Sequence, residues 1–294
     1  MALEEVQKEH PEISVIIPCH CRVEWIPRCL HALSKQDIGY SFQVVVIDDG
    51  SPNETEIYDL VMDAKSAEFT VDFERQTNSG PAVARNHGVR LSTGSILCFL
   101  DDDSVPEPEW LRNMVAPFLG NINVALVSGT IKSFFKEGLS AKLEKAVYTG
   151  THWATCNIAY RREVLLQLGG FDESFPEASW EDNDLGFRAR WGGFCHVMAT
   201  DAVVMHPHEQ TWTEFRAKCL TNGRGAARFC KKWIKNKPLW AMATPVLMTR
   251  RLLYGLNPFC WFGQFHSIAR IRFFWSWYSL KGFMGVLLET NQTR

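Results

Sequence analysis

The feature that most constrains the fold is a set of short, β-branched apolar runs that alternate with helical patterns over the first hundred residues. Residues 13–17 read Ile-Ser-Val-Ile-Ile, and residues 42–47 read Phe-Gln-Val-Val-Val-Ile. Runs of this kind are typical of strands buried on both faces of a parallel sheet. Residues 95–100 give a third such strand. The chain is therefore expected to be an α/β protein.

Helical patterns separate these strands. Between the first two, Trp25, Cys29 and Leu33 recur at helical spacing within residues 23–36. Similar helices are expected over residues 54–66, 81–92 and 107–119. Weaker strands are expected at residues 69–74, 123–130, 155–160 and 194–205. This repeated βα order predicts one sheet flanked by helices, and the weaker strands predict that the sheet becomes mixed near its end.

Charge and aromatic content divide the chain near residue 210. Residues 210–294 carry 14 Lys and Arg against 2 Asp and Glu, a balance of +12, although the whole chain has a net charge of −2. Six of the eleven tryptophans also fall there: Trp212, Trp233, Trp240, Trp261, Trp275 and Trp277. We therefore expect an acidic domain over residues 1–209 and a basic, aromatic extension over residues 210–294, with helices over 211–236, 239–256 and 262–289.

The extension has two interpretations. Cations interleaved with aromatic residues suit an anionic membrane surface, and a basic helical lid packed on the acidic domain would have the same composition. RNA binding would use these residue types too, but the small net charge argues against nucleic acid as a general partner. The uncharged stretch 252–269 contains Gly255, Asn257 and Pro258. An interfacial or re-entrant helix is therefore expected in preference to a transmembrane helix.

Cysteine usage bears on the compartment. The nine cysteines are odd in number, form no CxxC pair and follow no secretory leader. Reduced thiols are therefore expected, as in the cytosol. Together with the basic extension, this predicts a cytoplasmic protein that is peripheral on the inner face of a membrane.

Acidic residues follow two of the three confident strands. Asp48 and Asp49 end the second, and Asp101, Asp102 and Asp103 follow the third. Ligands of parallel sheets bind outside the carboxyl ends of the strands, so these groups are expected at one site. In an extended segment Asp101 and Asp103 would face the same side and could bind Mg²⁺ or Mn²⁺ with a diphosphate ligand. The alternative is a solvated turn and helix cap.

Several segments, taken in order, resemble the family 2 glycosyltransferases. They are residues 13–18, 44–51, 78–88, 99–103, 157–162, 169–172 and 181–188, and the resemblance covers roughly residues 13–206. It implies a GT-A fold, a Rossmann-like mixed sheet flanked by helices, for a catalytic domain over residues 1–209 that is followed by the helical basic-aromatic extension. It also implies inverting transfer of a sugar from a nucleotide-diphosphate sugar to a saccharide or lipid-linked acceptor, as in polysaccharide or glycolipid synthesis.

The resemblance also implies a donor site. Asp49 matches the aspartate that recognises the nucleotide base, with a plain turn residue as the alternative. Gly80 and Arg85 match the segment lining the nucleotide pocket, although Arg85 could equally make an ion pair on a helix surface. Asp101 and Asp103 match the D-x-D pair that binds metal and nucleotide sugar, and Asp102 lies between them in the same site.

The same resemblance implies a base and a further metal ligand. Glu181 and Asp182 match the E-D motif, in which the aspartate is the general base toward the acceptor hydroxyl. Trp180 and Glu181 are expected beside the acceptor. As an alternative, these acids stabilise a helix start, with Asp184 paired to Arg188 at i,i+4. His206 matches a histidine that completes metal coordination, and His208 is the alternative ligand.

Two other functions use part of this pattern. A nucleotidyltransferase that makes a sugar nucleotide would also have parallel strands and acidic metal ligands, but it usually carries a Gly-rich basic loop after the first strand. Residues 18–22, Pro-Cys-His-Cys-Arg, are not such a loop. A noncatalytic sugar-binding membrane scaffold would not need the acidic positions. The sequence therefore favours a metal-dependent inverting glycosyltransferase.

Overall fold

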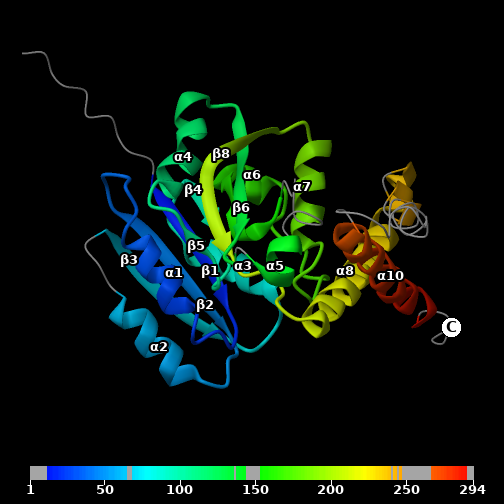
Figure 1. Ribbon diagram of the computed structural model, residues 1–294. Coiled ribbons are helices and arrows are strands. Elements are labelled where there is room, and N and C mark those ends of the chain that lie inside the picture. Colours follow the sequence, from blue (N-terminus) through cyan, green and yellow to red (C-terminus); the bar gives the residue numbers. More distant parts are fainter. Residues whose placement is uncertain are drawn as a thin grey trace, which may run out of the picture.

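The protein contains one eight-stranded sheet with helices on both faces, followed by two long helices that pack beside it (Figure 1). The computed structural model describes residues 12–64, 68–135, 137–143, 153–239, 241–243, 245–246 and 266–289. The strand order is β3-β2-β1-β4-β7-β6-β8-β5. The α/β class expected from the apolar runs is confirmed.

One half of the sheet is parallel. Its strands are β1 (Ile13–Cys19), β2 (Phe42–Asp49), β3 (Phe69–Gln76) and β4 (Ile96–Phe99). In the central strand, Val15 lies between Val44 of β2 and Cys98 of β4. The carboxyl ends of β1, β2 and β4 therefore meet at one edge of the sheet, as the sequence predicted.

The other half of the sheet is mixed, as expected. Its strands are β5 (Val105–Pro106), β6 (Val124–Ser133), β7 (Ile158–Arg161) and β8 (Cys195–His206). β7 runs antiparallel to both β4 and β6, whereas β8 runs parallel to β6. The strand expected at 155–160 begins later because residues 155–157 form a 3₁₀ turn. The two-residue strand β5 is too short to give a sequence pattern.

Alternating strand residues build two apolar layers. Val15 and Ile17 pack under α1 (Ile26–Leu33), α2 (Glu54–Asp63) and α4 (Trp110–Gly120). Ile16, on the opposite face of β1, packs under α3 (Pro81–Leu91), α6 (Arg162–Gln167) and α7 (Glu181–Trp191). Both sheet faces are covered, which explains why the central strands are apolar without alternation.

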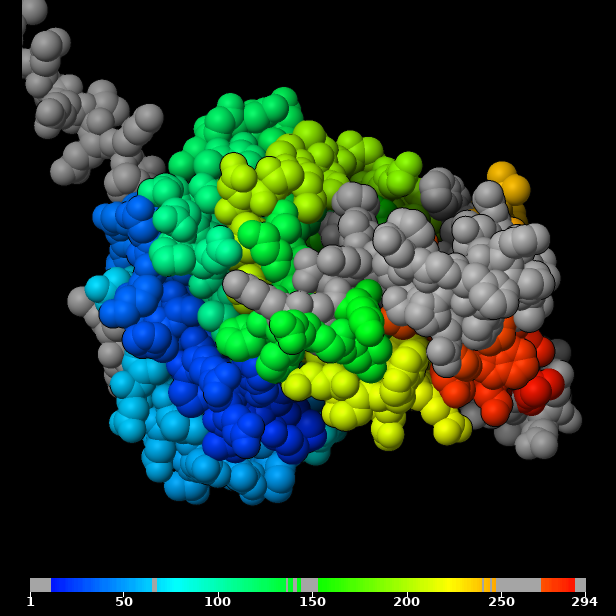
Figure 2. All heavy atoms as spheres, in the orientation of Figure 1, coloured from blue at the N-terminus to red at the C-terminus, as the bar shows by residue number. Residues whose placement is uncertain are grey.

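The C-terminal part is a pair of crossing helices, α8 (Trp212–Trp233) and α10 (His266–Glu289). A Cβ atom on Gly223 of α8 would lie 1.8 Å from the carbonyl oxygen of Ser279 in α10, so only glycine permits this crossing. The short helix α5 (Gly138–Leu143) also contacts α10. Figure 2 shows α8, in yellow, between the sheet domain and α10, in red. Two of the three predicted C-terminal helices are confirmed, and most of the one predicted over 239–256 lies outside the described residues.

Two sequence expectations concern the membrane and the thiols. Within the described parts of the chain, no helix is both long and apolar enough to cross a membrane. Most of the uncharged stretch 252–269 lies outside those parts. The eight cysteines that the structure describes are free thiols.

Candidate active site

Asp49, at the end of β2, is held by the segment that leads into α3. Its Oδ1 accepts hydrogen bonds from the Ser79 amide and from Nε2 of Gln76, both at 2.8 Å, and its Oδ2 accepts one from the Gly80 amide at 2.8 Å. Gly80 has φ +92°, and a Cβ there would lie 2.7 Å from the Pro176 carbonyl oxygen. Glycine is therefore required at residue 80, and the Asp49 carboxylate has one fixed orientation.

The three aspartates after β4 lie in a turn and have different partners. The amide of Ser104 donates to the carbonyl of Asp101 at 3.0 Å, so the segment turns and is not extended as the sequence argument assumed. Asp102 Oδ2 accepts a hydrogen bond at 3.2 Å from the amide of His20, the residue that follows β1. Asp101 and Asp103 nevertheless converge, because their carboxylates lie 3.9 Å and 3.2 Å from Nε2 of His206.

His206, at the end of β8, is the histidine that meets the acidic turn. Burial lowers its pKa, but the carboxylates of Asp103 and Asp101 outweigh this and raise the pKa above the ordinary value. Burial raises the pKa of Asp103, and the charges of His206 and Arg22 reverse this and lower it to about 2. Burial and the charge of His206 lower the pKa of His208 to about 3, so His208 is neutral.

These residues fit a divalent cation. Ligand atoms of Asp101, Cys156 and His206 all lie within 4.8 Å of one another. The buried Oδ1 of Asp103 has no hydrogen-bond donor of good geometry among the residues the structure describes. Burial, and then the charges of Asp101 and Asp103, raise the pKa of Cys156 well above its ordinary value, so the thiol is neutral. Two carboxylates and an imidazole are the ligands that Mn²⁺ or Mg²⁺ would use here.

Arg85 of α3 joins the metal-side acids to the E-D motif. Its Nη2 donates to Asp101 and its Nη1 donates to Glu181, each at 2.8 Å. Both Arg85 and Glu181 are buried, at 2% exposure each. The alternative of an ion pair on a helix surface is therefore wrong. Burial and the charge of Asp182 raise the pKa of Glu181 to about 7 in spite of Arg85.

Asp182 lies in the first turn of α7 and is partly exposed. Its Oδ1 accepts hydrogen bonds from the amide of Asn183 at 2.6 Å and from Nδ2 of Asn183 at 2.8 Å. Burial raises the pKa of Asp182, although the hydrogen bond from the Asn183 amide and the charge of Arg85 both act to lower it. Within the described chain Oδ2 accepts no hydrogen bond, so one carboxylate oxygen is held and the other is available.

The metal-side acids and Asp182 act on one buried thiol, that of Cys156. The charges of Asp101, Asp103 and Asp182 all add to the burial that raises the pKa of the Cys156 thiol. Cys156 precedes β7 in the 3₁₀ turn over residues 155–157. The three carboxylates are therefore near enough to the same buried thiol to act on its charge.

Helix α8 holds the start of α7. Trp180, the N-cap of α7, has φ +74°, a left-handed conformation that is costly for tryptophan. Its Nε1 donates to Asn222 Oδ1 of α8 at 3.0 Å, and its ring lies 5.1 Å from that of Phe229. The Trp180 side chain therefore packs against α8.

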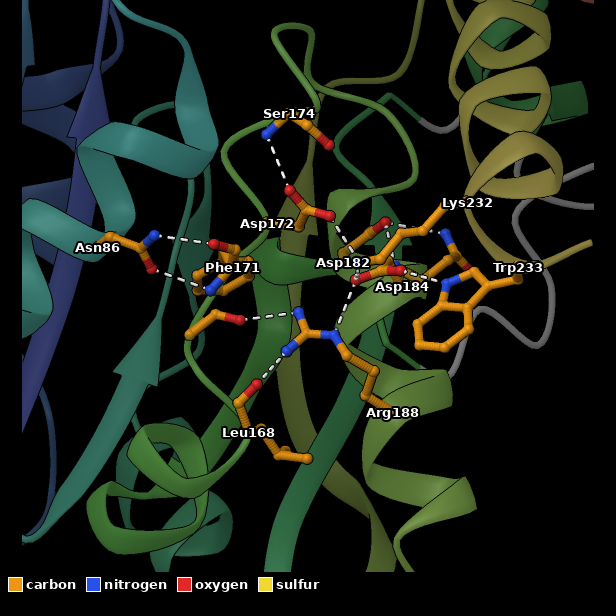
Figure 3. Close-up of polar contacts among 12 residues, drawn as sticks. Asn86, Leu168, Phe171, Asp172, Ser174, Asp182, Asp184, Arg188, Lys232 and Trp233 are labelled. Atoms are coloured by element: carbon orange, nitrogen blue, oxygen red, sulfur yellow. Dashed lines mark hydrogen bonds and ion pairs between the residues drawn. The ribbon is translucent and has the colours of Figure 1, made fainter. Parts of the chain in front are cut away.

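Asp184, on the next turn of α7, is the centre of a second set of contacts with α8 (Figure 3). Its Oδ2 accepts from Arg188 at 2.8 Å, which confirms the predicted i,i+4 pair. The same oxygen accepts from Lys232 at 2.8 Å, and Oδ1 accepts from Nε1 of Trp233 at 2.7 Å. Lys232 also binds Asp172 at 2.5 Å. The loop and helix that carry Asp182 are thus fixed by the extension.

Two cations of this site were missed by the sequence analysis. Arg22, just after β1, pairs with Asp103, and its Nε lies 3.5 Å from Asp102 Oδ1. Lys218 of α8 donates to the Ala178 carbonyl at 3.4 Å, beside the start of α7. Arg22 could have been found from its position just after a parallel strand, because residues there lie at the edge of the sheet where ligands bind. Lys218 was one of fourteen cations in the extension, and only packing distinguishes it.

Comparison with known proteins agrees with this architecture. The family described as Glycosyl transferase family 2 matches residues 14–173, more than half of the chain. Glycosyltransferase AglE of Haloferax volcanii is 29% identical over 233 residues, which cover 73% of each protein. The pre-mycofactocin glycosyltransferase of Mycobacterium tuberculosis is 28% identical over 235 residues, which cover 74% of this chain and 47% of that protein. The chain thus spans about half the length of the second relative.

A solved structure shares the fold. The mannosyltransferase PcManGT from Pyrobaculum calidifontis, in complex with GDP-Man and Mn²⁺, superposes with a TM-score of 0.69 at 18% identity, over 96% of this chain and 88% of that one. The GT-A fold implied by the sequence resemblance is confirmed, with the extension included in the superposed length. With its sequence match over more than half the chain and this fold, the protein belongs to glycosyl transferase family 2.

Proposed function

We propose that this glycosyltransferase moves a sugar from a nucleotide-diphosphate sugar to an acceptor hydroxyl with inversion and with the help of Mg²⁺ or Mn²⁺. The observation that carries the proposal is the pair of ion pairs through which Arg85 joins Asp101 to Glu181, with Asp182 next in sequence. Asp101 and Asp103 suit a cation that binds a diphosphate. Asp182 suits an acceptor hydroxyl. PcManGT, which has the same fold, binds GDP-Man and Mn²⁺.

On the donor side, each residue has a role that follows from its position. Asp49 would accept hydrogen bonds from the nucleotide base beside Gly80, and Arg85 would keep Asp101 oriented toward the diphosphate. Asp102 would support the turn through its contacts with β1. The cation would be held by Asp101, Asp103 and His206. When bound, it would neutralise charge on the leaving diphosphate.

On the acceptor side, the free Oδ2 of Asp182 would take the proton of the attacking hydroxyl. A bond forms between the acceptor oxygen and the anomeric carbon while the bond from that carbon to the diphosphate oxygen breaks. Displacement from the opposite face inverts the configuration. Glu181 would act indirectly, since its carboxylate binds Arg85, and Trp180 would fix the start of α7 from α8. Trp180 and Glu181 would thus shape the acceptor side by orienting Asp182.

The nucleotide pocket makes a direct binding prediction. In a thermal-shift assay, one or more of UDP, GDP and TDP should raise the melting temperature when Mn²⁺ is present, because a ligand that binds the folded state stabilises it. Asp103→Asn should lose the metal-dependent part of this shift, since Asp103 is a buried carboxylate beside His206. No shift with any nucleotide on the folded wild-type protein would contradict the proposal.

Asp37→Asn is a matched control for that experiment. Asp37 is an exposed carboxylate that pairs with Arg112, away from the aspartates at the sheet edge. It should keep the full metal-dependent shift. A loss of equal size in both variants would show that the assay reports general charge and not the pocket.

We propose a division of the chain into a catalytic domain over residues 1–209 and an extension over residues 210–294 that completes the site. Part of the basic charge of α8 is used internally, because Arg224, Arg228 and Lys232 pair with carboxylates of the catalytic domain. This supports the packed-helix interpretation for α8. α10 differs, since one of its faces is exposed.

That exposed face supports an anionic membrane surface as a partner and a lipid-linked or saccharide acceptor nearby. Trp277, Met284 and Leu288 of α10 are 48%, 43% and 59% exposed, and Lys281 lies on the same side. Spacing of three and four residues puts them on one helical stripe. Apolar side chains with a lysine between them suit an interfacial position on the cytoplasmic leaflet, which is the location we propose.

The membrane proposal predicts the effect of a double change. Trp277→Gln with Leu288→Gln should weaken sedimentation with phosphatidylserine-containing vesicles about tenfold or more, because each large apolar side chain contributes roughly 1.5–3 kcal/mol when buried. Leu119→Gln with Ile122→Gln makes a similar change at exposed positions of the sheet domain and should have little effect. Equal vesicle binding by all three proteins would exclude α10 from the contact.

A further inference from the structure

The cations of α8 that face the catalytic domain fall into two kinds. Arg224 and Arg228 bind Glu177 at 2.5 Å and 2.9 Å, and Lys232 binds two aspartates. Lys218 lies nearer the start of α8, is half-buried, and among the described residues has no carboxylate oxygen within 4.0 Å. Its Nζ donates one long hydrogen bond of 3.4 Å, to the Ala178 carbonyl. Lys218 therefore faces the catalytic domain as the other three cations do, but no carboxylate of the described residues pairs with its ammonium group.

The Lys218 ammonium group lies beside the loop that leads into α7. Ala178 is two residues before Trp180, the N-cap of the helix that carries Asp182. After burial and the contributions of His206 and Arg22, the charge of Lys218 further lowers the pKa of Asp103. The same charge opposes the burial that raises the pKa of Asp182. One ammonium group thus acts on both the metal-side acids and the base.

The two carboxylates on which the charge of Lys218 acts have other partners. Asp103 pairs with His206 and Arg22, and Asp182 accepts from Asn183. A partly desolvated ammonium group is costly unless it meets an anion, and the packing of α8 holds this one in place. An anion from a substrate, located between Asp103 and Asp182, would supply the missing partner.

We infer that Lys218 binds a phosphate oxygen of a substrate held between Asp103 and Asp182. The inference rests on the proposed function, and it adds a residue from outside the segment that matches the family. Two substrates carry such a group. One is the donor, through its β-phosphate, and the other is an acceptor that carries a phosphate, such as a polyprenyl phosphate.

Each source gives Lys218 a definite task. With the donor, its charge would stabilise the diphosphate as the bond to the anomeric carbon breaks and the electron pair moves to the diphosphate oxygen. With the acceptor, Lys218 would hold the phosphate so that the attacking oxygen lies beside Asp182. In both cases the extension contributes a binding residue to the site.

The experiment compares Lys218→Gln and Lys218→Met with Lys235→Gln. Lys235 follows α8, is exposed, and provides the same loss of charge away from the pocket. Dissociation constants are measured by calorimetry for UDP, UMP, GDP and GMP with Mn²⁺, and for farnesyl phosphate. We expect a Lys218 variant to bind diphosphates or farnesyl phosphate about ten- to a hundredfold more weakly, as for a lost hydrogen bond to a charged group. Lys218→Arg should recover most of the affinity.

The outcomes distinguish a donor phosphate from an acceptor phosphate, and they distinguish failure of the Lys218 inference from failure of the proposed function. Weaker binding of diphosphates with unchanged monophosphates assigns the donor β-phosphate, and weaker binding of farnesyl phosphate alone assigns the acceptor. If wild type binds these ligands and both Lys218 variants match Lys235→Gln within about twofold, the inference is overturned while the proposed function stands. If folded wild type binds none of them, both fail. Two Lys218 substitutions guard against one that does not fold.

Discussion

Asp182→Asn is expected to reduce sugar transfer by about two to four orders of magnitude while leaving metal-dependent nucleotide binding intact. The amide is nearly isosteric with the carboxylate, and its oxygen can still accept from Asn183 at the position of Oδ1. What is lost is the basic oxygen that would take the acceptor proton. The effect should therefore fall on kcat, with little change in the dissociation constant for the nucleoside diphosphate.

The measurement is the turnover number with a saturating nucleotide sugar and Mn²⁺, beside a nucleotide titration on the same preparation. Asp201→Asn provides a control, because Asp201 is an exposed aspartate of β8. It should keep wild-type turnover. Wild-type turnover in a folded, donor-binding Asp182→Asn protein would remove Asp182 from the base role.

The pH dependence gives a second view of the same residue. Burial raises the pKa of Asp182 above the ordinary value of an aspartate. The base must be deprotonated, so activity should fall as pH drops through this raised pKa. The acidic limb of kcat, measured with saturating Mn²⁺ at each pH, should thus lie above the ordinary range for an aspartate. A limb at the ordinary aspartate value would contradict a buried base.

Arg85→Met should be among the most destabilising single substitutions in the sheet domain. It would leave Glu181 buried with no cation and would also remove the partner of Asp101. Breaking a buried ion pair from one side typically costs about 3–5 kcal/mol. Arg112→Met, in an exposed pair with Asp37, should cost less than about 1 kcal/mol. Urea unfolding of the three proteins at pH 8 measures the difference.

A second substitution tests the cause of that loss. Glu181→Gln added to Arg85→Met removes the unpaired charge and should restore a large part of the stability. Lowering the pH should also help Arg85→Met, because burial and Asp182 already raise the pKa of Glu181 to about 7. A raised carboxyl pKa means that the folded state holds the proton more tightly, so stability increases as pH falls. A defect independent of both pH and Glu181 would point to lost packing.

Local sequence patterns predicted most of the sheet domain. The apolar runs of β1, β2 and β4 were recognisable because burial on both sheet faces favours apolar residues at most positions. Helix ends were less accurate: the helix expected over 23–36 is Ile26–Leu33. Short elements such as β5 and α6 were missed, since two or six residues do not establish a period.

By itself, the sequence determined the α/β class, the edge of the sheet where acidic residues gather, and a basic helical extension. These follow from local periodicity, strand direction and composition, which need no knowledge of distant contacts. The tertiary structure decided what those residues meet. It paired Asp102 with the His20 amide, buried Arg85 between Asp101 and Glu181, and placed Lys218 beside the loop that leads into α7. Partners separated by 16 to 96 residues are chosen by packing, because the energy of a buried charge depends on groups that no local pattern encodes.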